Sequence, residues 1–230
     1  MDVYNLVLET TRRCNFQCEH CMRGDAQPKD MTPEVVDAVL RDVDYIRQVT
    51  FTGGEPSLPG SVTVIRYFLE RCKALEIPID AFYIATNGGP TSHSDAFIRI
   101  LLDLYLYCDD KYICAVDVSN SVWHAAFQES EDLGVLGALR FVSKRRELDE
   151  RSVLSIGRAG EYGIGNRVHT IEKWDPEYPE DATFYITVDG SVMPDCNLSY
   201  EQMEEEIRGN ILQDSLQTIY DRETKLKEAV

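Results

Sequence analysis

The sequence lacks any apolar run that approaches the roughly 18 residues needed to span a membrane, and its amino terminus lacks the basic and apolar regions of an export signal. Positive charge is scarce, because 23 Lys and Arg stand against 40 Asp and Glu, for a formal net charge of −17. Such a chain repels a phosphate polymer at long range. The composition therefore disfavours both a membrane protein and a direct binder of nucleic-acid polymers.

Without an export signal, the seven cysteines are expected in a reducing, cytoplasmic compartment, where a disulfide framework is not expected. Three of them, Cys14, Cys18 and Cys21, have the spacing CxxxCxxC. A mononuclear zinc site usually takes four ligands in two separated pairs, and no second pair follows. His20 is adjacent to Cys21, and neighbouring side chains rarely reach the same ion. An iron–sulfur cluster usually has four cysteine ligands, so three cysteines leave one iron open.

The chain alternates short β-rich runs with segments of helical periodicity, a pattern typical of βα units around a parallel sheet. Helices are expected to begin at Thr32, Ser61 and near Ser94, with a fourth over 136–142 and a last one from about Ser215. The turn at Asp189 predicts a β-hairpin between 183–188 and 191–193. Strands are expected over 4–10, 48–52, 81–86, 112–118 and 151–156, with a sixth over 167–171 or 183–188.

Five or six βα units are too few for a closed eight-stranded barrel of about 250 residues. The predicted fold is therefore α/β, a partial (β/α)6 TIM-like barrel with a short C-terminal β-hairpin plus helix extension. Residues 1–175 are assigned to the barrel and 176–230 to the extension. The functional site of such a fold lies at the carboxyl ends of the strands. The cysteine loop, 53–56, 87–89 and 117–120 all fall at such ends.

These motifs together resemble the radical S-adenosylmethionine (SAM) enzymes. Residues 9–21 are similar to the family's first strand and cluster loop, 51–56 (FTGGEP) to its glycine-rich SAM motif, and 86–88 to its TNG motif. The likeness spans roughly the first 160 residues. It implies that a [4Fe–4S] cluster is held by Cys14, Cys18 and Cys21, and that its fourth iron binds the amino and carboxylate groups of SAM.

The same resemblance assigns further residues to SAM. It places His20 near the adenine, the glycine-rich motif at the methionine end, and Asp117 and Ser119 at the ribose, although their order reverses the family's Ser-x-Asp. Residues 157–159 (Gly-Arg-Ala) resemble a segment whose arginine pairs with the SAM carboxylate. The expected SAM-binding residues are His20, Gly53, Gly54, Glu55, Pro56, Thr86, Asn87, Asp117, Ser119 and Arg158. Candidates for the substrate-facing lining are Asn87, Asp117, Trp123, His124 and Arg158.

The carboxy-terminal residues 188–196 and 208–211 resemble the start of a SPASM or twitch extension, which normally holds auxiliary iron–sulfur clusters. Cys196 is the one cysteine in this stretch, so the extension is expected to lack an auxiliary cluster. Its thiol has two interpretations, a hydrogen-atom donor to a substrate radical or an ordinary buried cysteine.

The resemblance implies an enzyme that cleaves SAM reductively and uses the resulting 5'-deoxyadenosyl radical to abstract hydrogen. The first substrate hypothesis is a peptide or amino-acid side chain, and the second is a small metabolite or nucleotide. A non-catalytic zinc-binding scaffold is the alternative from another class. Four basic and two acidic residues over 12–29 suggest docking of a flavodoxin or ferredoxin-type electron donor. The competing interpretation is that these cations hold a carboxylate of SAM or of the substrate.

Overall fold

The computed structural model describes residues 1–128, 132–145, 150–171, 173–175, 177–178 and 181–228. They form one eight-stranded sheet in the order β5-β4-β3-β2-β1-β6-β7-β8. The first six strands are parallel to their neighbours, and β7 and β8 are antiparallel. The strands are β1 (Asp2–Thr11), β2 (Tyr45–Gly53), β3 (Ile79–Thr86), β4 (Ala115–Val118), β5 (Val142–Lys144), β6 (Thr183–Ile186), β7 (Ser191–Met193) and β8 (Gly209–Asn210).

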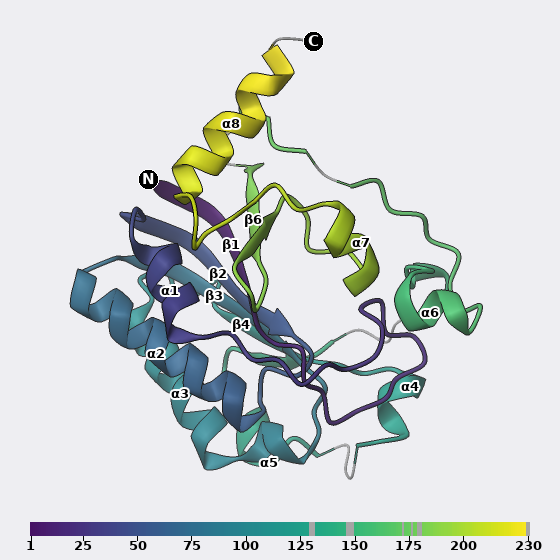
Figure 1. The fold of residues 1–230 in the computed structure, drawn as a ribbon. Coiled ribbons are helices and arrows are strands. Elements are labelled where there is room, and N and C mark those ends of the chain that lie inside the picture. The colour runs from purple at the N-terminus through teal and green to yellow at the C-terminus, as the bar shows by residue number, and fades with distance from the viewer. Residues whose placement is uncertain (129–131, 146–149, 172, 176, 179–180, 229–230) are drawn as a thin grey trace.

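Helices α1 (Pro33–Leu40), α2 (Pro59–Leu75) and α3 (Asp95–Tyr107) lie together on one face of the sheet (Figure 1). The short helices α4 (Val122–Ala125), α6 (Gly157–Glu161) and α7 (Tyr200–Glu205) surround the end toward which the parallel strands point. The remaining elements are η1 (Pro90–His93), α5 (Gly134–Gly137), η2 (Glu150–Ser152) and α8 (Leu216–Glu228). Among the described residues, no helix has the length and apolar character needed to cross a lipid bilayer.

The main core lies between the sheet and helices α1, α2 and α3, because the strands alternate in polarity. Phe51 and Phe82 are fully buried in this core, whereas their neighbours Thr50 and Tyr83 are only partly buried. Successive side chains of a strand point to opposite faces, so the second face of the sheet is polar over β2 and β3. That face is available to line a site.

The opposite face of β1 and β6 is covered by a second, smaller core. The chain that follows β7 folds back over these two strands and supplies half of the side chains of this second core. Its members are Val7, Tyr185, Met193, Leu198, Tyr200 and Met203. Residues from the predicted extension therefore pack on the barrel strands and join the same sheet; residue 176, at the expected boundary, lies outside the described residues.

The prediction of a mixed α/β fold with an open, mainly parallel sheet is confirmed, as are the first three strands, the hairpin and the last helix. The fourth strand is shorter than predicted, because residues 111–113 form a turn and Tyr112 is almost fully exposed. Helix α5 ends at Gly137, since the chain turns there toward β5.

The fifth and sixth strands differ most from expectation. The prediction of a strand over 151–156 is wrong: η2 and a single bridge from Leu154 to Arg167 occupy it, and β5 is Val142–Lys144 instead. Of the two alternatives for the sixth strand, 183–186 is the strand and 167–171 is not. It pairs with β1 rather than β5, so the parallel sheet grows at both edges.

Candidate active site

A cavity of about 790 Å³ lies at the carboxyl ends of the parallel strands. Its walls come from the cysteine loop, the loops after β2, β3 and β4, helix α6, and the start of α7. Most of the residues singled out from sequence motifs share this one cavity. The lining includes Cys14, Cys18, Cys21, His20, Gly53, Gly54, Glu55, Pro56, Thr86, Asn87, Ser119 and Arg158.

The cysteine loop is closed at its neck by the backbone. Arg12 N donates to Lys29 O, and Gln27 N donates to Arg12 O, both at 2.9 Å. Within the loop, Cys21 N donates to Cys18 O at 3.2 Å. These bonds fold the loop back on itself, and the three cysteines between residues 14 and 21 line one cavity.

The cysteines of this loop are free thiols in a partly desolvated setting. Burial raises the pKa of Cys14 to about 11 and that of Cys18 to about 12, and each thiolate would also repel its neighbours. The backbone N–H of Phe16 and the Asn87 amide act in the opposite direction at Cys14. The Cys14 and Cys18 thiols are therefore protonated near neutral pH, and a metal centre has to displace these protons when it binds.

The arrangement of the thiols suits a cluster better than a single ion. Among the described residues, no three His, Cys, Asp or Glu side chains come close enough to hold one metal ion. In a [4Fe–4S] cluster each cysteine thiolate binds a different iron, so the three sulfurs need not surround one ion. Three soft sulfur donors on one loop thus fit such a cluster, with one iron left for another ligand.

The glycines after β2 are required by the approach of two backbones. A Cβ on Gly53, whose φ is +129°, would lie 1.9 Å from Thr11 O, and one on Gly54 would lie 2.0 Å from Arg13 O. Gly54 N and Glu55 N donate to these same carbonyls, at 2.7 and 2.9 Å. The glycine loop therefore lies directly against the start of the cysteine loop, and its other side faces the cavity.

Glu55 connects the loops that follow β2 and β3. Its buried carboxylate accepts hydrogen bonds from Ser57 N at 2.9 Å, Thr86 Oγ1 at 2.6 Å and Asn87 N at 2.8 Å. Burial raises the pKa of this carboxyl. Asn87 extends the connection, since its Nδ2 donates to Asn15 Oδ1 at 2.8 Å in the cysteine loop. The three sequence motifs form one hydrogen-bonded unit.

An aromatic wall stands beside the cysteines. His20 stacks on Trp123 with 4.5 Å between ring centroids, and His124 meets His20 edge-on at 4.8 Å. Burial lowers the pKa of both histidines to about 4, so both rings are neutral at pH 7. Ser121 Oγ pairs with His124 Nδ1 at 2.7 Å, whereas the buried Nδ1 of His20 has no partner among the described residues. Neutral, flat rings suit a planar heterocycle such as adenine.

The two residues that were expected at the SAM ribose, Asp117 and Ser119, have different surroundings. Ser119 lines the cavity, and its N–H donates to Thr86 O at 2.8 Å. The Asp117 carboxylate instead accepts hydrogen bonds from Tyr83 and Ser143, both at 2.9 Å, and does not belong to the lining. A contact of Asp117 with the SAM ribose stays a prediction.

The Gly-Arg-Ala segment forms the first turn of α6 and packs on the cysteine loop. A Cβ on Gly157 would lie 2.4 Å from Met22 O, and Ala159 N donates to Cys21 O at 3.3 Å. Arg158 lines the cavity with its Nη1 3.4 Å from Asp25 Oδ1. Cys196, in contrast, is partly buried against the second core and is not a lining residue.

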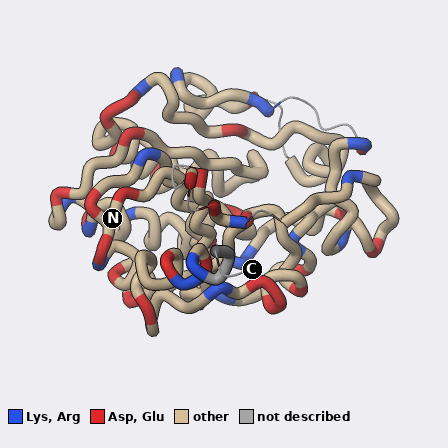
Figure 2. Tube along the Cα trace, turned by 90° about the horizontal axis from the view of Figure 1, so that it is seen from above, with Lys and Arg blue, Asp and Glu red and all other residues tan. Residues whose placement is uncertain are grey.

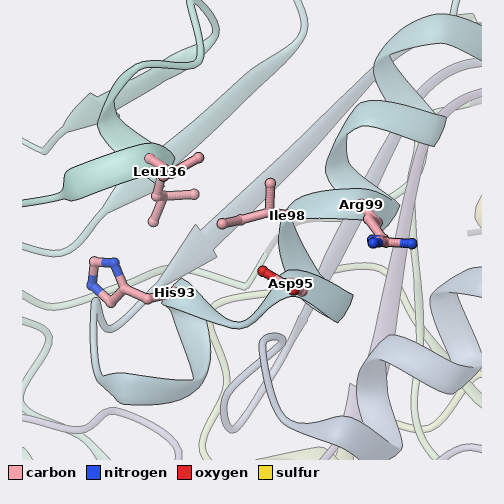
Figure 3. Close-up of a pocket in the computed structure, with 6 residues that line it drawn as sticks. His93, Asp95, Ile98, Arg99 and Leu136 are labelled. Atoms are coloured by element: carbon pink, nitrogen blue, oxygen red, sulfur yellow. The ribbon is translucent and has the colours of Figure 1, made fainter.

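Sequence reasoning missed one side of this cavity. The chain brings distant residues to it: Arg23 from the cysteine loop, Arg145 after β5, Arg167 from the segment after α6, and Asn197 and Tyr200 near α7. The excess of basic residues over 12–29 was the one feature of the sequence that pointed to this side of the cavity. A second hollow of about 290 Å³ lies between η1, α3 and α5 and includes His93, Ile98 and Leu136 (Figure 3). It shares no lining residue with the large cavity.

The sequence model of the radical SAM superfamily matches residues 8–172, which is more than half of the chain. The chain belongs to the radical SAM superfamily. Enzymes of this superfamily use a [4Fe–4S] cluster and SAM, and the three thiols of the cavity fit that cluster. Membership leaves the zinc-binding scaffold without support.

Two curated relatives match shorter stretches. Protein YfkA of Bacillus subtilis is 39% identical over 62 residues, which cover 25% of this chain and 17% of YfkA. GTP 3',8-cyclase of Streptomyces coelicolor is 36% identical over 93 residues, which cover 36% of this chain and 26% of the cyclase. The matched stretches thus span about a sixth and a quarter of these relatives.

Two solved structures are similar over the whole chain at low identity. Streptococcus suis SuiB bound to its precursor peptide SuiA has a TM-score of 0.48 and 12% identity, with 99% of this chain and 67% of SuiB covered. Native anSMEcpe with bound AdoMet and the Cp18Cys peptide has a TM-score of 0.48 and 13% identity, with 100% and 84% covered.

Proposed function

We propose that this protein is a radical SAM enzyme that cleaves SAM reductively at a [4Fe–4S] cluster held by Cys14, Cys18 and Cys21. The observation that carries the proposal is the single cavity that the three thiols share with the glycine-rich loop, Asn87 and Arg158. A reduced cluster bound there would supply the one electron that splits the SAM sulfonium into methionine and a 5'-deoxyadenosyl radical, which would take a hydrogen atom from the substrate.

The chain's own residues position SAM in this proposal. The backbone of Gly53 and Gly54 faces the methionine end, held rigid by its contacts with β1. Arg158 offers a cation to the SAM carboxylate, and Ser119 offers a hydroxyl to the ribose. The stacked rings of His20 and Trp123 present an apolar face to the adenine and exclude water beside it.

The substrate we propose first is an amino-acid side chain, within a peptide or free, and the second is a small metabolite or nucleotide. A cavity of about 790 Å³ is within the range of sites that take ligands of drug size. The hollow of Figure 3, at about 290 Å³, is much smaller and shares no lining residue with this cavity. The volume of the large cavity supports entry of one side chain or one small molecule beside SAM.

An acidic flavodoxin or ferredoxin-type donor is part of the proposal, as is a reducing, cytoplasmic location, consistent with seven free thiols. Only some of the basic residues over 12–29 could contact such a donor. Arg12 and Arg23 are 7% and 8% exposed and cannot contact a protein partner. Arg13 and Lys29 are exposed and remain for that role. Cluster reduction by such a donor should slow as ionic strength rises, and a flat response would exclude electrostatic docking.

The direct test is formation of 5'-deoxyadenosine. Protein purified without oxygen, reconstituted with iron and sulfide, and reduced in the presence of SAM should release 5'-deoxyadenosine and methionine in equal amounts. Unreduced enzyme is the matched control and should release neither. Iron-loaded, reduced enzyme that leaves SAM intact, both alone and with candidate substrates, would contradict the proposal.

A further inference from the structure

The lining of the large cavity has more arginines than carboxylates, although the chain as a whole is strongly acidic. Its lining contains five arginines and two carboxylates, Asp25 and Glu55. The Asp25 side chain is 88% exposed to solvent, and the Glu55 carboxylate already accepts three hydrogen bonds from within the chain. Figure 2 shows Asp and Glu spread over the whole trace rather than gathered on one side. A cationic cavity in a protein of net charge −17 favours an anionic ligand.

Arg23 is a buried arginine of this lining that has no carboxylate of the described residues beside it. Its side chain is almost fully buried, its Nη1 donates to Leu198 O at 2.5 Å, and its guanidinium carbon lies 5.0 Å from the Tyr185 ring centroid. Among the described residues, no carboxylate comes within the 4.0 Å of an ion pair. A backbone carbonyl and an aromatic face do not neutralise a positive charge.

The neighbouring Arg12 shows the contrast. Its Nε donates to Glu9 Oε2 at 2.9 Å in a buried ion pair, and its guanidinium carbon lies 4.5 Å from the Tyr200 ring centroid. Glu9 acts electrostatically on both guanidiniums, so one buried carboxylate serves two buried cations. Asp189 also acts on Arg12, but from an exposed position. Because Glu9 is paired with Arg12, Arg23 has no ion-pair partner of its own in the part of the chain that the structure describes.

Two further polar atoms near Arg23 lack partners. Glu9 Oε1 and the Tyr185 hydroxyl are fully buried, and neither has a hydrogen-bond partner among the described residues. Buried polar groups are almost always satisfied in native proteins, and a guanidinium cannot discard its charge by losing a proton. The group around Arg23 is therefore incomplete without a ligand or ordered water.

This cationic group lies on a different side of the cavity from the expected SAM site. The SAM motifs follow β2, β3 and β4, whereas Arg23 contacts Tyr185 of β6 and Leu198 before α7. In the sheet, β1 separates β2 from β6. Arg158 is available for the SAM carboxylate on α6. Arg23 is therefore available to bind an anion other than the SAM carboxylate.

We propose that Arg23 binds an anionic oxygen group of the substrate, a carboxylate or a phosphate, at the β6 side of the cavity. A guanidinium suits either group, because its planar fork can donate two parallel hydrogen bonds to a carboxylate or phosphate. This inference rests on the proposed function, since it assumes that the cavity also holds the substrate. It narrows the substrate class to molecules that carry such a group near the hydrogen to be removed.

The test measures anion binding to the cluster-loaded, SAM-bound enzyme through its melting temperature. Inorganic phosphate and succinate are each titrated against chloride at constant ionic strength. One of the two should raise the melting temperature by about 3 °C or more at saturation, and the more effective anion identifies phosphate or carboxylate as the recognised group. No rise with either anion, or a rise that disappears when SAM is bound, overturns the proposal.

Two variants localise the effect. Arg23→Met removes the charge at similar length and should abolish the anion-dependent rise. Arg66→Met is the matched control, because Arg66 lies on α2 in an exposed pair with Asp103, and it should keep the full rise. An Arg23→Met protein that keeps the rise overturns the proposal.

A second measurement needs no variant and applies even where Arg23→Met does not fold. Selenate soaked into crystals of the SAM-bound wild-type enzyme should give an anomalous peak within hydrogen-bonding distance of the Arg23 guanidinium. Absence of that peak overturns the proposal. Neither experiment depends on SAM cleavage, so failure of anion binding is distinguishable from failure of the proposed enzyme activity.

Discussion

The two sides of the large cavity differ in how completely the chain satisfies its own polar groups. On the side of β2 and β3, the Glu55 carboxylate receives three hydrogen bonds, and the glycine loop lies against the β1 backbone. On the side of β6, Arg23 lacks a carboxylate partner and the Tyr185 hydroxyl lacks any hydrogen-bond partner among the described residues.

This difference separates two kinds of preorganisation. The first side is rigid before any ligand arrives, which suits a cofactor that must be held in one orientation at each turnover. The second side stores an uncompensated charge, which costs stability in the free protein and favours a ligand of opposite charge. Substitutions on the first side should therefore damage the protein itself, and those around Arg23 should damage ligand binding.

The largest expected effect comes from the cysteine loop, on which both sides depend. Cys14→Ala, Cys18→Ala and Cys21→Ala should each lose the iron–sulfur centre and all SAM cleavage, because each removes one of the three proposed ligands. Iron content and 5'-deoxyadenosine after reconstitution measure the two losses. Cys72→Ala is the control, since Cys72 is buried under the helices away from the cavity, and it should keep both. Cleavage retained by any of the three would show that the ligands are misassigned.

A backbone substitution on the rigid side should be nearly as damaging. Gly53→Ala places a Cβ 1.9 Å from Thr11 O at a φ of +129° and should lower the free energy of unfolding by more than about 3 kcal/mol. Gly163→Ala is matched, because it also has a positive φ but nothing within 4 Å, and it should cost about 1 kcal/mol. Urea unfolding measures both. Equal costs would show that the close contact with β1 does not hold the loop.

A pair of side-chain substitutions sharpens the comparison of the two sides. Glu55→Gln turns one acceptor into a donor that faces a backbone N–H and should cost about 2 kcal/mol. Arg23→Met removes an uncompensated buried charge and should change the stability of ligand-free protein by less than about 1 kcal/mol. Urea unfolding of the two variants without ligands tests this. If Arg23→Met lost more free energy of unfolding than Glu55→Gln, the β6 side rather than the β2 and β3 side would be the one that stabilises the free protein.

The smallest effect concerns the aromatic wall. Burial lowers the pKa of His124 from 6.5 to about 4, so the unfolded chain binds a proton between these values that the folded protein excludes. This contribution to stability is present above pH 6.5 and is lost as the pH falls toward 4. Relative to His124→Gln, the wild type should lose about 1 kcal/mol between pH 7 and pH 4.5, after allowance for its partial exposure. A constant difference across that range would mean that His124 titrates normally.

The local pattern of the sequence predicted the elements that local physics controls. The strands β1 to β3 and the helices α1 to α3 carry enough alternation or helical periodicity to be recognised. Strand β5 has three residues, too few for a periodic signal, whereas the β-rich run over 151–156 is held in η2 and a single bridge by its surroundings. The pairing of β6 with β1 joins residues about 178 positions apart, and no local pattern encodes it.

The residues of the candidate site also fall into those that a local sequence pattern reveals and those that it does not. The cysteines, glycines and Asn87 were found because their residue types and spacing are unusual within short segments. Arg23 and Tyr200 were missed because their role arises from the return of the chain over β1 and β6. Arg23 stood out only as one of four basic residues in its loop, and the sequence did not show that it is buried while Arg13 stays exposed.

The most direct test of the central claim is electron paramagnetic resonance of the anaerobically reconstituted, reduced protein before and after addition of SAM. The account predicts about four iron and four sulfide per chain, and a [4Fe–4S]⁺ signal whose shape changes when SAM binds the open iron. Protein that takes up no iron, or a cluster signal that SAM leaves unchanged, would contradict it.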